Sequence, residues 1–111
     1  MEEIRYDSEE LKRLCTDARF ARGRIGVPGA KKLTLRLAQL EAAPTLGELP
    51  NAGRPHALER DLAGFFAAAL DGGRRLIFKP LDPAPLNGRG EIEWQRVSRI
   101  IITAIKDYHR G

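Results

Sequence analysis

Cysteine and histidine are scarce in this chain of 111 residues, which contains one cysteine and two histidines. The single cysteine, Cys15, excludes an internal disulfide, and it forms no spacing typical of a metal site. We therefore expect no cofactor, no bound metal and a reducing, cytoplasmic setting. Cys15 lies on the apolar side of a predicted helix, so we interpret it as a small core residue and not as a reactive thiol.

Long hydrophobic runs are also missing. None approaches the roughly 20 apolar residues that a membrane helix requires, so we expect no membrane partner. The first residues, Met1–Glu3, are acidic, and we expect no signal peptide. The length is typical of one domain, which we place at residues 1–111.

Acidic residues are outnumbered by basic ones. The 19 lysines and arginines exceed the 15 aspartates and glutamates, giving a net charge of +4 and a pI of about 9.6. This charge favours an anionic partner such as a nucleic acid or an acidic protein. Many small basic proteins bind nothing anionic specifically, so the charge alone does not choose a function.

The first half of the chain has helical periodicity. Residues 4–6 alternate as a short strand, and a helix then begins at Asp7 or Ser8 and carries its apolar face through residue 18. Residues 19–29 are rich in arginine and glycine, which predicts a loop. Residues 30–43 form the clearest helix, which ends before a proline. Its apolar stripe consists of Leu33, Leu37 and Leu40, flanked by Ala30 and Leu35.

The second half has strand periodicity. Residues 64–70 and 74–79 are predicted strands joined by an Asp71-Gly72-Gly73 turn. Residues 80–90 hold three prolines and two glycines, which predicts a long mobile hairpin tip, and residues 91–94 extend the strand that follows. The last run is rich in β-branched residues and is the strongest strand signal. The order predicts an α+β fold in which a helical hairpin covers one face of an antiparallel sheet.

Reactive side chains gather where the terminal strand ends, at Asp107, Tyr108, His109 and Arg110. The other histidine, His56, lies at the start of the sheet. Imidazoles exchange protons near neutral pH, and with nearby arginines they meet the needs of RNA cleavage without a metal. Successive strand residues point to opposite faces, so the terminal residues share one pocket only if the strand twists or ends there.

Several segments resemble the HigB, or plasmid-maintenance killer, branch of the RelE/ParE toxin superfamily. The terminal Asp-Tyr-His run is the most specific of them. The segments that carry the resemblance are residues 31–40, 46–59, 64–66, 74–79 and 107–110. The resemblance implies a RelE-like fold, in which an N-terminal helical hairpin packs on a curved antiparallel sheet of about four or five strands.

The same resemblance implies a ribosome-dependent mRNA endonuclease, the toxin of a type II toxin–antitoxin system. Its implied partners are the ribosome with its mRNA and a cognate helix-turn-helix antitoxin, with operator DNA contacted only through that antitoxin. The candidate catalytic residues are His56, Arg75, Asp107, Tyr108 and His109. The candidate RNA-binding residues are Arg60, Arg74, Arg89 and Arg110.

Two positions depart from the family pattern. Glu59 stands where members usually have lysine, and Ala69 stands where they usually have arginine. Both changes remove positive charge, which weakens phosphate binding. The Pro80–Gly90 extension is longer than usual, and it either supplies Arg89 as a replacement cation or blocks the site. Two alternatives therefore stay open: a catalytically weakened binding module of the same fold, and, less favoured by the terminal run, a ParE-like gyrase inhibitor.

Overall fold

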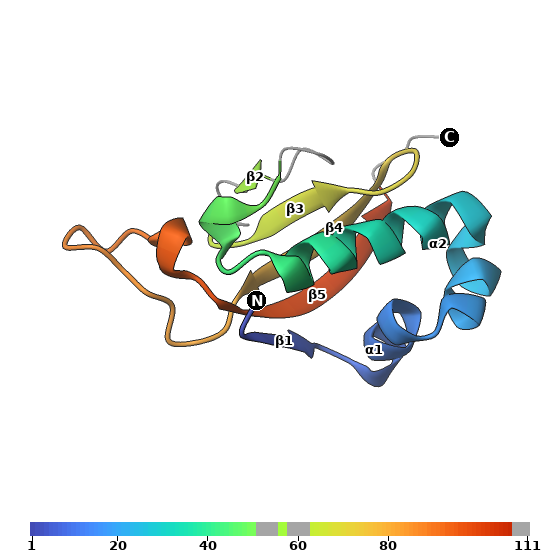
Figure 1. Cartoon of the computed structure of the whole chain (residues 1–111), viewed down its shortest axis with the longest axis horizontal. Coiled ribbons are helices and arrows are strands. Elements are labelled where there is room, and N and C mark those ends of the chain that lie inside the picture. Colours follow the sequence, from blue (N-terminus) through green and yellow to red (C-terminus); the bar gives the residue numbers. More distant parts are fainter. Residues whose placement is uncertain (51–55, 58–62, 108–111) are drawn as a thin grey trace.

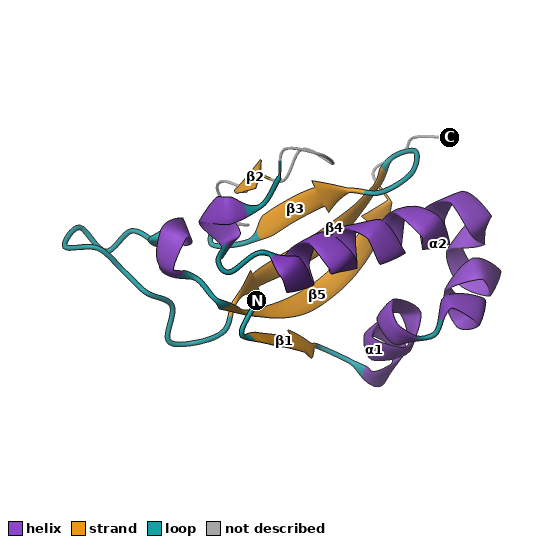
Figure 2. Ribbon diagram, in the orientation of Figure 1, coloured by secondary structure: helices purple, strands orange, loops and turns teal. Residues whose placement is uncertain are grey.

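In a computed structural model, one long helix lies across a face of a twisted sheet (Figures 1 and 2). The structure describes residues 1–50, 56–57 and 63–107. Within these residues, five strands form a sheet in the order β1-β5-β4-β3-β2. The layered arrangement is that of an α+β fold, as predicted.

Two helices follow one another with a single residue between them. Helix α1 spans Glu9–Thr16, and the Ser8 hydroxyl caps it by accepting from the Leu11 amide. Helix α2 spans Ala18–Ala42, and the Asp17 carboxylate caps it by accepting from the Phe20 amide. Each cap satisfies a backbone donor that the first helical turn leaves unpaired.

The predicted loop at residues 19–29 is wrong, because this segment belongs to α2. The interruption is confined to a kink at Gly26, whose φ of 79° is a conformation that glycine adopts without strain. Pro28 follows in the first turn after the kink, where a proline fits because that turn needs no amide donor. The composition predicted a loop over these residues, but the structure has a helix that is interrupted at Gly26.

The strands β2 to β5 form the predicted antiparallel sheet. They span His56–Ala57, Phe66–Ala69, Arg74–Pro80 and Arg99–Asp107. The predicted turn between β3 and β4 is confirmed, with the Leu70 amide bonded to the Arg74 carbonyl and Gly72 at a φ of 53°. Strand β1, Glu3–Tyr6, pairs in parallel with β5. The long connection through both helices and the other strands permits this direction, which a short hairpin would not.

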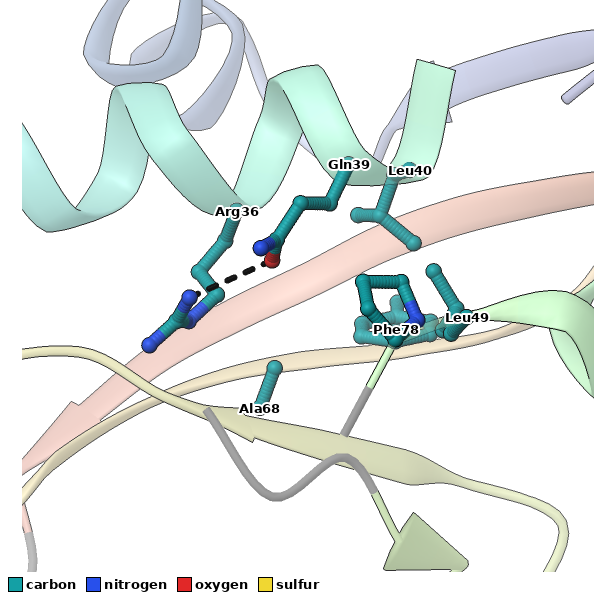
Figure 3. Close-up of a pocket in the computed structure, with 7 residues that line it drawn as sticks. Arg36, Gln39, Leu40, Leu49, Ala68 and Phe78 are labelled. Atoms are coloured by element: carbon teal, nitrogen blue, oxygen red, sulfur yellow. Dashed lines mark hydrogen bonds between the residues drawn. The ribbon is translucent and has the colours of Figure 1, made fainter. Parts of the chain in front are cut away.

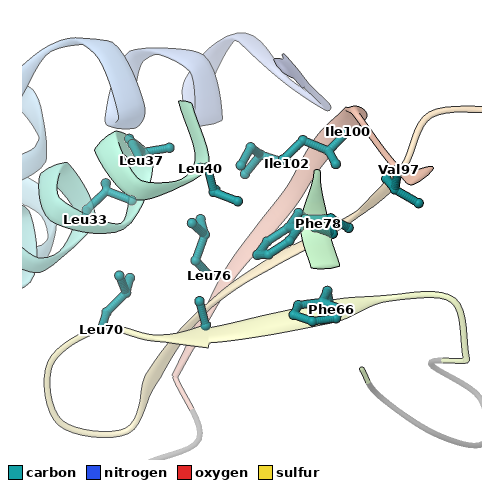
Figure 4. Packing of buried hydrophobic residues seen from close by; sticks show 12 residues of the cluster. Leu33, Leu37, Leu40, Phe66, Leu70, Leu76, Phe78, Val97, Ile100 and Ile102 are labelled. Atoms are coloured by element: carbon teal, nitrogen blue, oxygen red, sulfur yellow. The ribbon is translucent and has the colours of Figure 1, made fainter. Parts of the chain in front are cut away.

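One hydrophobic core joins α2 to the sheet (Figure 4). Leu33, Leu37 and Leu40 of α2 pack on Leu76 and Phe78, which are fully buried. Ile100 and Ile102 of β5 complete this layer. The expected stripe on α2 is therefore correct except for Leu35, which is 45% exposed and points away from the core.

The segment between β4 and β5 is organised by its own hydrogen bonds. The Asn87 side-chain oxygen accepts from the amides of Arg89 and Glu91, and Leu86 pairs with Ile92. The strand predicted at residues 91–94 is wrong, because Ile92 forms only an isolated bridge there and a 3₁₀ turn begins at Trp94 and ends at Arg96. Trp94 packs edge-on against Phe66, with ring centroids 5.0 Å apart. Among the described residues, no helix is long and apolar enough to cross a membrane.

Candidate nucleic-acid interface

The sheet face opposite α2, which we call the open face, carries charged side chains. Alternate residues of a strand point to opposite faces. On β4, Leu76 and Phe78 enter the core, so Arg75, Ile77 and Lys79 lie on the open face. Arg75 and Lys79 are partly exposed there, whereas Ile77 between them is buried at 3% exposure. The apolar pattern that buries one side of β4 thus presents two cations on the other.

Arg75 and Lys106 are direct neighbours across β4 and β5. Their Cβ atoms are therefore roughly 5 Å apart, and like charges so placed repel one another. The Arg75 guanidinium donates to the Arg74 carbonyl at 3.0 Å. Among the described residues, neither cation forms an ion pair with a carboxylate. A phosphate between them would relieve the repulsion.

Most other arginines of the described segments are neutralised. Six form ion pairs with a nearby carboxylate: Arg5, Arg13, Arg24, Arg74, Arg96 and Arg99. On the open face itself, Glu3 binds both Arg99, at 2.9 Å, and Arg5. Hydrogen bonds from Arg99 and Arg5 lower the pKa of Glu3 below its ordinary 4.5, so this carboxylate stays charged. The positive charge left for a ligand on β4 and β5 is therefore that of Arg75, Lys106 and Lys79.

Lys79 lies over an aromatic ring. Its ammonium is 5.3 Å from the centre of the Phe65 ring, and both side chains are partly exposed. Lys79 is four residues from Arg75 on the same face of one strand, a distance of about 13 Å. A cation beside an exposed ring is a common element of single-stranded nucleic-acid sites, where rings stack on bases.

Ala69, which stands where members of the family that this chain resembles usually have arginine, lies directly beside Arg75 in the sheet. Ala69 is the β3 neighbour of Arg75, and Lys106 is its neighbour on β5. The row Ala69–Arg75–Lys106 thus carries a cation on one flank of Arg75 and a methyl group on the other. The sequence interpretation missed Lys106, and its only signal was the position one before Asp107, because register is needed to bring it to Arg75.

The structure separates several predicted site residues. Asp107 ends β5 opposite Arg74, one position along from the Arg75–Lys106 pair and on the other face by alternation. Arg74 binds Asp71 at 3.3 Å and the Ile25 carbonyl at 3.2 Å, so it joins the β3–β4 turn to the α2 kink. Arg89 is exposed on the extension beyond the far end of β4 (Figure 1), so it does not replace a cation beside Arg75.

The remaining predicted residues are less defined. His56 pairs with Ala67 at the start of β2, which places its backbone in the sheet. Arg60, Tyr108, His109, Arg110 and the departure at Glu59 lie outside the described residues. Their roles stay predictions.

A buried arginine lies on the covered side of the sheet (Figure 3). Arg36 of α2 is 6% exposed, and it donates to the Ala69 carbonyl at 2.8 Å and to the Gln39 side chain at 3.2 Å. Among the described residues, β2 pairs with residues 66 and 67, so this arginine supplies a donor to β3 beyond the described end of β2. The adjoining hollow has room for about one water molecule, which is too little for a ligand. We therefore interpret Arg36 as a structural residue that stabilises the fold.

Metal and thiol chemistry receive no support from the described residues. They contain no group of three or more histidine, cysteine, aspartate or glutamate side chains arranged to hold a metal ion. Burial raises the pKa of the Cys15 thiol to about 12, so it stays protonated at neutral pH. Cys15 packs against the core, as expected.

Comparison with known proteins gives a match in structure but not in sequence. No protein-family model and no curated protein matches the chain. Among solved structures, the chain is similar to the YoeB–YefM complex from Staphylococcus aureus, with a TM-score of 0.58, 17% identity and 99% of each chain covered. A YoeB/ParE toxin from Agrobacterium tumefaciens has a TM-score of 0.58 and 13% identity, over 96% of this chain and 99% of that one.

A third similar structure is a YafQ mutant from E. coli, with a TM-score of 0.57 and 18% identity, over 97% of this chain and 94% of that one. At these identities the likeness establishes the fold. It extends over nearly the whole length of every protein compared, so it is not a shared fragment. The chain therefore has the predicted RelE-like fold, which is the fold of these YoeB, YoeB/ParE and YafQ structures.

Proposed function

We propose that this chain is the toxin of a type II toxin–antitoxin system and cleaves mRNA on the ribosome. The observation that carries the proposal is the Arg75–Lys106 pair, two adjacent cations on the open face of a toxin fold. A structure of similar fold is a toxin–antitoxin complex, which supports an antitoxin as the partner of this chain.

The proposed chemistry is attack of a ribose 2′-hydroxyl on the adjacent phosphate, without a metal. Arg75 and Lys106 hold the phosphate and stabilise the charge that develops on its oxygens. His56 and His109 are proposed to move the protons, one taking the hydroxyl proton and the other protonating the leaving 5′-oxygen. Tyr108 is proposed to orient the nucleotide. Asp107 was a candidate for the same role, but it lies on the other face of β5 from the Arg75–Lys106 pair, so we give it no contact with the bound phosphate.

Inducible expression with mapping of mRNA 5′ ends tests this proposal. We expect growth arrest and new 5′ ends within translated codons. Arg75→Gln and His109→Ala should each abolish both, while Lys12→Gln, which removes an exposed cation from α1, should leave both unchanged. Uncut mRNA in cells that accumulate the folded wild-type protein would reject the nuclease.

One observation favours a second candidate, a binding module that has lost its catalytic power. Ala69 leaves the β3 side of Arg75 without a cation. In that case the wild-type protein would bind its antitoxin or RNA without producing new 5′ ends. A supercoiling assay with DNA gyrase, in which we expect no inhibition, separates both candidates from a gyrase inhibitor.

A further inference from the structure

The solvent side of α2 carries an unusual apolar surface. Val27 is 51% exposed and Leu35 is 45% exposed, and they are two of the three most exposed large hydrophobic side chains among the described residues. They line one open groove of about 480 Å³ together with Pro28, Lys31, Lys32 and Asp71. Exposed apolar residues that share a groove usually mark a binding surface.

The spacing on this side of α2 suits a second helix. Pro28, Lys31, Leu35, Ala38 and Ala42 are all exposed and recur at intervals of three and four residues, which we call the α2 strip. This is the spacing of the seam along which two helices pack. The small side chains of Ala38 and Ala42 allow close approach, and the strip is roughly 21 Å long, or about four helical turns.

The charges beside the strip indicate the partner's chemistry. Lys31 and Lys32 border the groove, and neither forms an ion pair with another described residue. A second groove, on the other flank of Val27 and Lys31, adds Arg22. The one carboxylate in the lining, Asp71, is already bound to Arg74. The strip therefore fits an amphipathic helix whose apolar stripe meets Leu35 and whose flank carries carboxylates.

We propose that the α2 strip is the docking surface for an acidic amphipathic helix of the antitoxin. The inference rests on the proposed function, because that function supplies the partner. Figure 1 shows α2 over one face of the sheet, and the Arg75–Lys106 pair belongs to the opposite face. A helix bound there contacts the toxin without filling the open face.

The test uses the full-length chain and the protein encoded by the adjoining reading frame, with affinity measured by titration calorimetry. Leu35→Asp places a charge in the seam and should weaken binding about tenfold or more. Lys31→Glu combined with Lys32→Glu should also weaken binding and should reduce its dependence on salt. Both changes are at exposed positions, and unchanged melting temperatures confirm that the variants fold.

Leu86→Asp is the matched control, because Leu86 is 52% exposed but lies on the extension between β4 and β5. It should leave the affinity unchanged. The inference is overturned if Leu35→Asp binds within about twofold of the wild type, or if Leu86→Asp weakens binding equally. If the charge-reversed variant loses affinity for a single-stranded RNA oligonucleotide but keeps its antitoxin affinity, the strip is an RNA surface and the inference fails. If the wild type does not bind this protein, both the docking surface and the antitoxin partner of the proposed function are rejected.

Discussion

The two faces of the sheet differ in what their polar side chains are bonded to. On the face covered by α2, the buried Arg36 is bonded to the Ala69 carbonyl and to Gln39. On the open face, Arg75 and Lys106 stand side by side, and no described carboxylate neutralises them. The cation on the covered face stabilises the fold through its hydrogen bonds. The two cations on the open face repel one another, and a bound anionic ligand would stabilise them.

The same contrast separates cations within the open face. Arg5 and Arg99 share Glu3 at the β1 edge, while Arg75 and Lys106 lie toward the other end of β4 and β5. Proteins commonly retain such a costly arrangement at functional sites. Substitutions on the covered face should therefore lower the free energy of unfolding, whereas substitutions on the open face should weaken RNA binding and cleavage.

The largest effect on stability should come from Phe78→Ala on the covered face. Phe78 is fully buried in the core, so its truncation should lower the free energy of unfolding by about 3–5 kcal/mol. Urea denaturation measures the loss. Lys106→Ala on the open face is the control and should change the same quantity by no more than about 0.5 kcal/mol. Equal losses would remove the distinction between the faces.

The two arginines provide the next test. Arg36→Met removes the donor to the Ala69 carbonyl and should cost about 1–3 kcal/mol of unfolding free energy. Arg75→Met, which keeps similar bulk at a partly exposed position, should cost less than about 1 kcal/mol. Thermal or urea unfolding of both variants compares them directly. A larger loss for Arg75→Met would mean that Arg75 serves the fold.

A smaller effect is expected on binding to a single-stranded RNA oligonucleotide. If Lys106 contacts a phosphate, Lys106→Gln should weaken binding and reduce the slope of log affinity against log salt by about 0.7. Fluorescence anisotropy at several salt concentrations gives this slope. Lys12→Gln on α1 should leave it unchanged. An unaltered slope for Lys106→Gln would show that this lysine binds no phosphate.

The smallest effect should be the pH dependence of the Glu3 pairs. Arg99 and Arg5 lower the pKa of Glu3, so its contribution to stability is present above the unfolded pKa of about 4.5 and is lost as the pH falls through the lower folded value. Glu3→Gln should therefore be slightly less stable than the wild type at pH 7. Denaturation at pH 7 and pH 3 should show that this difference becomes smaller in acid, and a difference that grows as the pH falls would contradict the ion pairs as its cause.

Local patterns predicted much of this fold. The apolar stripe of α2, the Asp71–Gly73 turn and the terminal strand all follow from spacing and turn chemistry that neighbouring residues determine. The loop predicted at residues 19–29 is wrong because the Asp17 carboxylate caps a helix there, and arginine-rich composition does not prevent a helix from forming. Composition does not show that a single positive φ, at Gly26, accommodates the break.

The candidate site depended on long-range register. Arg75 could be named from the sequence, but Lys106 becomes its neighbour only through the β4–β5 pairing. Register also places Asp107 opposite Arg74, whose ion pair with Asp71 and bond to the Ile25 carbonyl no local pattern reveals. Arg36 is a charged residue whose burial no local pattern reveals, and only the packing of α2 on β3 buries it.

Primer extension on mRNA bound to purified ribosomes tests most directly whether the open face cleaves RNA. The purified wild-type chain should produce a new 5′ end within the codon at the ribosomal A site, and the same mRNA without ribosomes should stay intact. Arg75→Gln should give no product at an unchanged melting temperature. Intact ribosome-bound mRNA with the folded wild-type chain, or equal cleavage by Arg75→Gln, would contradict the role given to the open face.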